Sequence, residues 1–180
     1  MDRVFNTVCL ILFVIVSCTQ EVPPEDVFDN PLDEEEVTYE TPALTFYPLD
    51  ISIDLGSSQT VDVFVLGIDD LAGSYIKINY DKNKLTVISV AVGEFFTDSM
   101  HDPVFLVDDD TDNGFIEINT SFLGSDSVSV SGTGSLASIV FQSTADGESS
   151  LLFDSLCEFV DPDDNPIEIR GFGVGVVNAQ

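Results

Sequence analysis

One acidic run in the sequence has the residue types that bind a hard cation. Residues 108–114 read Asp-Asp-Asp-Thr-Asp-Asn-Gly, and an EF-hand register that starts at Asp109 fits this run as far as Gly114. Thr120 stands where that register needs a bidentate Glu, and a hydroxyl cannot chelate as a carboxylate does. Two interpretations stay open, a solvated acidic turn, which we favour, and a weak Ca²⁺ site. The Ca²⁺ ligands would then be Asp108, Asp110 and Asp112.

No group of residues has the spacing of a catalytic centre. The single histidine, His101, lies beside Asp102 in an expected loop, and no nucleophile-elbow motif accompanies it. A pair of carboxylates for glycoside hydrolysis cannot be singled out among 33 Asp and Glu residues. Of the three cysteines, only Cys157 lies in the expected domain, where we expect it to pack as a small hydrophobe. We predict that the protein is not an enzyme and needs no cofactor.

The charge is strongly one-sided. The 180 residues include 33 Asp and Glu against 5 Lys and Arg, which gives a formal net charge of −28. Binding of DNA or RNA needs clustered Lys and Arg to neutralise phosphates, so a nucleic-acid partner is excluded. Docking on an anionic membrane through a basic patch is excluded for the same reason.

The N-terminal segment has the features of a secretory signal. Arg3 precedes a short apolar run, Val8–Val16, which is too short to span a bilayer. Ile15-Val16-Ser17-Cys18 then resembles a bacterial lipobox, so we expect residues 1–17 to be a lipoprotein signal peptide and Cys18 to carry the lipid. This arrangement predicts a protein anchored by lipid in the cell envelope, at the outer membrane or cell surface. The alternative is an ordinary signal peptide cut nearby, or an uncleaved anchor.

Residues 18–42 are predicted to form a disordered tether. Between Thr19 and Pro42 the chain carries nine acidic residues and four prolines, with no Lys or Arg. Like charges repel one another and proline lacks a backbone donor, so this composition does not favour packing. The remaining residues, 43–180, are expected to form one domain.

That domain is predicted to be all-β, because apolar and polar residues alternate in several segments. Residues 60–65 place three valines on one face. Residues 75–80 place Ile76, Ile78 and Tyr80 inward and the residues between them outward, and 115–119 and 137–141 repeat the pattern. Turn-forming clusters separate these segments, and only Gly93–Pro103 could hold a helical turn. Short strands with one apolar face indicate a β-sandwich.

The order of these segments resembles the cohesin family, the sandwich modules that hold dockerin-bearing partners in cellulosome-type assemblies. The resemblance rests on the strand at Val61–Val65, the Tyr80-Asp81 turn with Leu85 and Gly93 after it, the Gly-rich approach at 132–141, and the closing residues 173–177. It implies a β-sandwich of nine or a similar number of strands with jelly-roll topology, as in many carbohydrate-binding modules.

The resemblance also implies a partner-binding face on the strands that correspond to residues 74–80, 104–108, 115–121 and 136–142. The outward residues expected on this face are Tyr75, Lys77, Asn79, Glu117, Asn119, Ser138, Val140 and Gln142. Some cohesins carry an Asn and an Asp early on the first of these strands, where this chain has Gly73 and Tyr75. We therefore expect that any partner specificity of this chain differs from that of those cohesins.

Three functions follow as hypotheses. The first, which we favour, is a surface-tethered, non-catalytic module of cohesin type that docks a dockerin-bearing protein in polysaccharide degradation. The second is direct polysaccharide binding, which the lack of Trp disfavours because sugar rings usually stack on exposed aromatic residues. The third is a structural lipoprotein of the envelope.

Overall fold

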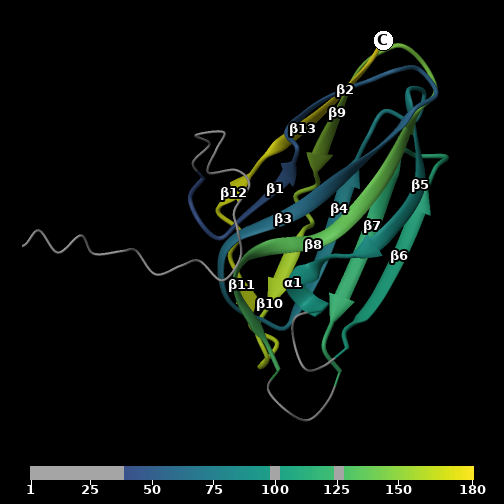
Figure 1. The fold of residues 1–180 in the computed structure, drawn as a ribbon. Helices are drawn as coiled ribbons and strands as arrows, with labels where there is room; N and C mark the ends of the chain where they lie inside the picture. Colours follow the sequence, from purple (N-terminus) through teal and green to yellow (C-terminus); the bar gives the residue numbers. More distant parts are fainter. Residues whose placement is uncertain (1–38, 98–101, 124–127) are drawn as a thin grey trace, which may run out of the picture.

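The computed structural model describes residues 39–97, 102–123 and 128–180. These residues form thirteen strands and one short helix, arranged as a two-layered β-sandwich (Figure 1). The predicted fold class is confirmed. Nine strands have five or more residues and four are shorter. The signal peptide, Cys18, most of the tether and His101 lie outside the described residues. Within the described ranges, no helix has the length and apolar character needed to cross a membrane.

The first sheet, sheet A, is built on two long antiparallel strands. β3 (Ser58–Leu71) pairs with β8 (Val130–Ser143) over most of their length, and register shifts mark bulges after Val63 and Val65. The order across sheet A is β12-β1-β3-β8-β5. Its other members are β1 (Ala43–Tyr47), β5 (Leu85–Val92) and β12 (Gly171–Phe172).

The second sheet, sheet B, has β4 (Gly73–Asn79) at its centre. One edge of β4 pairs along its whole length with β7 (Phe115–Ser121), which pairs in turn with β6 (Val104–Asp110). The other edge of β4 is shared by β10 (Glu158–Val160) and β9 (Gly147–Phe153). The remaining strands of sheet B are β2 (Asp50–Ile53), β11 (Pro166–Ile167) and β13 (Val174–Ala179).

The core lies between the sheets and follows the predicted alternation. Val61, Val63 and Val65 of sheet A are fully buried, and so are Ile76 and Ile78 of sheet B. Burial of an aliphatic side chain of this size contributes about 1.5–3 kcal/mol to stability. Because these side chains point inward, the alternate residues of each strand must point outward.

A helical turn covers one end of the sandwich. α1 (Glu94–Thr97) lies in the segment where the sequence allowed one, and it buries Phe95 and Phe96. The Phe95 ring lies against Gly134 of β8, where an added Cβ would come within 2.6 Å of the ring. Gly134 therefore allows the close packing of α1 against β8.

Contacts of the sandwich begin before Ala43, the expected start of the domain. The backbone N–H of Arg170 donates to the carbonyl of Pro42 (2.8 Å), and Nη1 of Arg170 donates to the carbonyl of Thr41 (3.2 Å). Tyr39 packs against Ala43 and Leu66. Residues 39–42 are therefore held by the sandwich.

The charge of the folded unit predicts a salt-dependent stability. From Ala43 onward the chain has 23 Asp and Glu against four Lys and Arg, a net charge of −19. Mutual repulsion destabilises the compact state, and salt screens it. We expect the melting temperature to rise with NaCl, mostly below about 0.15 M, where the Debye length is still about 8 Å or more. Differential scanning calorimetry across this range measures the effect, and a flat response would contradict it.

Candidate docking face

The outward side of β6, β7, β4 and β10 forms a continuous surface, which we call the β4–β7 face. The strand register aligns its side chains in rows across the sheet. In one row Leu106 lies opposite Asn119, Asn119 opposite Tyr75, and Tyr75 opposite Glu158. Tyr75 is half-buried, whereas the other three are exposed. Side chains from four strands therefore lie side by side on one surface.

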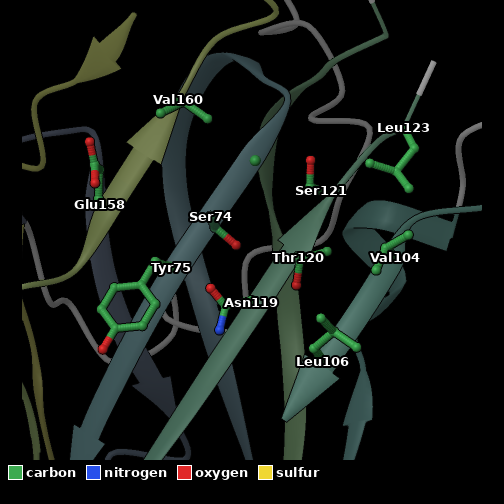
Figure 2. Close-up of a pocket in the computed structure, with 11 residues that line it drawn as sticks. Ser74, Tyr75, Val104, Leu106, Asn119, Thr120, Ser121, Leu123, Glu158 and Val160 are labelled. Carbon is green, nitrogen blue, oxygen red and sulfur yellow. The ribbon is translucent and has the colours of Figure 1, made fainter. Parts of the chain in front are cut away.

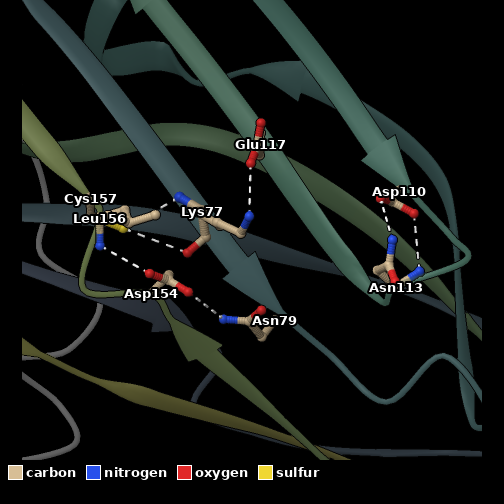
Figure 3. Close-up of polar contacts among 8 residues, drawn as sticks. All are labelled: Lys77, Asn79, Asp110, Asn113, Glu117, Asp154, Leu156 and Cys157. Atoms are coloured by element: carbon tan, nitrogen blue, oxygen red, sulfur yellow. Dashed lines mark hydrogen bonds and ion pairs between the residues drawn. The ribbon is translucent and has the colours of Figure 1, made fainter.

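The next row carries a cation held in place by its neighbours. Lys77 lies opposite Glu117, and its Nζ is 2.8 Å from Glu117 Oε1 (Figure 3). The same Nζ lies 3.6 Å from the centroid of the Phe115 ring, a cation–π contact. The hydrogen bond from Lys77, followed by one from Tyr75, lowers the pKa of Glu117. The charge of Lys77 is thus largely neutralised by its neighbours.

The loop after β9 borders this row. Asp154 accepts hydrogen bonds from Leu156 N–H (3.0 Å) and from Asn79 Nδ2 (3.5 Å) (Figure 3). The Cys157 Sγ accepts from the backbone N–H of Lys77 (3.3 Å) and donates to its carbonyl (3.5 Å). Burial raises the pKa of the Cys157 thiol. Cys157 packs against the core, as expected, and also ties the loop to β4.

The structure divides the eight predicted face residues between two sheets. Tyr75, Lys77 and Asn79 on β4 and Glu117 and Asn119 on β7 share the β4–β7 face. The other three, Ser138, Val140 and Gln142, lie on β8 in sheet A.

The prediction that all eight residues share one face is therefore wrong. β8 pairs with β3 and β5, which places its outward side on the opposite surface of the sandwich. There the Ser138 hydroxyl donates to Asp62, and Gln142 Nε2 donates to the Gly56 carbonyl (3.0 Å). Whether the five remaining residues bind a partner stays a prediction.

The acidic run between β6 and β7 forms a hydrogen-bonded turn. Asp110 accepts from the backbone N–H (3.0 Å) and from Nδ2 (2.8 Å) of Asn113, and the Nδ2 bond is the main cause of its lowered pKa. Asp109 accepts a hydrogen bond from the Tyr80 hydroxyl (3.1 Å). Burial, followed by the charge of Asp109, raises the pKa of Tyr80 to about 12.

The same acidic run carries the Ca²⁺ hypothesis. Within the described residues, no group of three or more His, Cys, Asp or Glu side chains could hold a metal ion. Whether Asp108, Asp110 and Asp112 bind Ca²⁺ or form a solvated acidic turn stays a prediction.

A shallow groove lies at the Gly73 end of the β4–β7 face (Figure 2). Its volume is about 260 Å³. Two of its lining residues are strongly exposed aliphatic side chains, Leu106 (61%) and Leu123 (75%). The sequence pattern did not predict this groove, although an outward Leu106 in the apolar segment 104–107 is a signal for it. The lining residues are Gly73, Ser74, Tyr75, Val104, Leu106, Asn119, Thr120, Ser121, Leu123, Glu158 and Val160.

A broad sheet face with mixed polar and apolar side chains is the geometry of a protein-binding module. The chain belongs to the cohesin family, because the model of the cohesin domain matches residues 51–176. No curated protein matches the chain.

Solved structures of cohesins share the fold. A non-cellulosomal cohesin from Archaeoglobus fulgidus is 20% identical, with a TM-score of 0.62, and the match covers 77% of this chain and 91% of that one. A type II cohesin from the cellulosome of Acetivibrio cellulolyticus is 15% identical, with a TM-score of 0.68 and coverage of 77% and 96%. A cohesin–dockerin complex from Clostridium thermocellum contains a chain 18% identical, with a TM-score of 0.63 and coverage of 77% and 98%.

The Lys77–Glu117 pair makes a testable pH prediction. Glu117 has a lower pKa in the folded chain than in the unfolded chain, mainly through the hydrogen bond from Lys77. The stabilisation from this pair is therefore fully present above the unfolded pKa and is lost as the pH falls through the folded pKa. In an NMR titration of the side-chain carboxyl carbons, we expect Lys77→Met to raise the pKa of Glu117. An unchanged pKa would show that the ion pair does not form in solution.

The acidic turn makes a second prediction. Because Asp110 is engaged by Asn113, we expect Ca²⁺ to find no strong site there. Isothermal titration with Ca²⁺ should give the same small heats for the protein and for a variant with Asp108, Asp110 and Asp112 replaced by Asn. Saturable binding that the triple replacement removes would restore the Ca²⁺ hypothesis.

Proposed function

We propose that the protein is a non-catalytic docking module whose β4–β7 face binds a dockerin-bearing protein. The observation that carries the proposal is the alignment of outward side chains from β6, β7, β4 and β10 into one surface. Such a surface can meet a partner over many contacts, as protein interfaces require. Cohesins of the same fold are named in complexes with dockerins, among them one from Acetivibrio cellulolyticus with a Cel5 dockerin.

Direct sugar binding has less support on this face. A sugar ring needs a free aromatic surface for stacking. The Phe115 ring is already in contact with Lys77, and Tyr75 is half-buried. A protein partner is therefore the favoured occupant.

The cellular setting is part of the same proposal. A lipid on Cys18 and the acidic segment to Pro42 would hold the module away from the membrane, where it could collect secreted enzymes that degrade polysaccharides. The support is the lipobox-like end of the signal segment and the tether composition. Mass spectrometry of the membrane fraction would detect a diacylglyceryl group on Cys18 if the anchor exists.

The docking proposal predicts which face of the sandwich binds the partner. We expect the chain to bind at least one member of a panel of purified dockerin modules immobilised on biosensor chips. Tyr75→Ala removes a central aromatic side chain of the β4–β7 face and should weaken that binding by about tenfold. The matched control is Val140→Ala on sheet A, which should change the affinity by less than about twofold.

Two outcomes would contradict the proposal. One is the absence of binding to every dockerin in the panel while the protein retains its folded melting transition. The other is a larger loss of affinity for Val140→Ala than for Tyr75→Ala, because that result would place the partner on sheet A.

A further inference from the structure

One of the residues that line the groove is a glycine, Gly73, at an outward position on β4. Tyr75 and Lys77 point outward, so the alternation places position 73 on the same side. Gly73 has no left-handed φ, and a Cβ added there would lie 3.0 Å from Val160 Cγ2. The backbone conformation therefore does not require glycine at this position. Glycine here lets the Val160 side chain pack closely against β4, so these two residues together form one side of the groove.

The walls of this space are mainly aliphatic. Val104, Leu106 and Leu123 stand on one side and Val160 on the other, as Figure 2 shows. The strong exposure of both leucines leaves apolar surface unburied in the free protein. A cavity of about 150 Å³ already admits benzene, so about 260 Å³ suffices for one large aliphatic or aromatic side chain.

The charge around the groove is negative. Glu158 stands at its rim, and no Lys or Arg is among the lining residues that the structure describes. The nearest row carries Asp108 and Glu117 against Lys77, and Lys77 is paired with Glu117. A cation approaching beside the groove would therefore meet the exposed carboxylate of Glu158, whereas an anion would be repelled.

We propose that the groove receives a single large apolar side chain of the docked protein, flanked by a Lys or Arg that pairs with Glu158. This inference rests on the proposed function and specifies what the partner must present.

The test uses four short stapled helical peptides as probes. They differ only at two neighbouring surface positions, which carry Leu and Arg, Ala and Arg, Leu and Glu, or Ala and Glu. In NMR titrations of the ¹⁵N-labelled chain, we expect the Leu–Arg peptide to bind about tenfold more tightly than any other. The amides of Gly73, Ser121 and Glu158 should shift most.

Variants of the chain then separate the two contacts. Leu106→Asn and Leu123→Asn change exposed residues, so they should leave folding intact and reduce the preference for Leu over Ala. Glu158→Gln should remove the preference for Arg over Glu and keep the preference for Leu. Ile88→Asn on β5 is the matched control, because Ile88 is 55% exposed but lies in sheet A.

The outcomes distinguish this inference from the docking proposal. If the Leu–Arg peptide binds no more tightly than the Ala–Glu peptide, the inference is wrong, whatever the dockerin panel gives. If a dockerin binds and Leu106→Asn leaves its affinity unchanged, the docking proposal is supported and the proposal that the groove receives an apolar side chain is wrong. If the Leu–Arg peptide binds most tightly and no dockerin binds, the groove does receive an apolar side chain, and the partner that supplies it is not a dockerin.

Discussion

The structure depends on one constraint, the burial of one side of each long strand between two sheets. Ile76 and Ile78 on β4 and Ile116 and Ile118 on β7 are completely buried. A shift of either strand by one residue would expose these side chains and bury charged ones, so the register is strongly specified. The rows of the β4–β7 face follow from that register. The surface proposed for docking is thus held in place by the core beneath it.

On this face Lys77 is neutralised by its neighbours, so the negative charge of the other carboxylates is available to a partner. Lys77 is neutralised by Glu117 and covered from one side by the Phe115 ring. Other carboxylates, such as Glu158, stay exposed. Acidic surfaces attract basic partners from a distance and raise association rates at low salt. An acidic face of this kind therefore suits a basic protein surface.

Alternation in the sequence predicted the sandwich, the buried valines of β3 and the outward residues of β4 and β7. It could not predict that Ser138, Val140 and Gln142 lie on the other sheet. A period of two tells which side chains of a strand point inward, and sheet membership depends on long-range pairing, here between β3 and β8. The groove was missed for a related reason. It combines Gly73, Leu106 and Val160 from three strands, and only the register brings them together.

Methyl NMR would test the central claim most directly. Spectra of the chain with labelled Ile, Leu and Val methyl groups would be recorded alone and with a bound dockerin module. The account predicts that the methyl signals of Leu106, Leu123 and Val160 shift while those of Ile88 and Val140 stay in place. Shifts confined to Ile88 and Val140 would place the partner on sheet A and contradict the account.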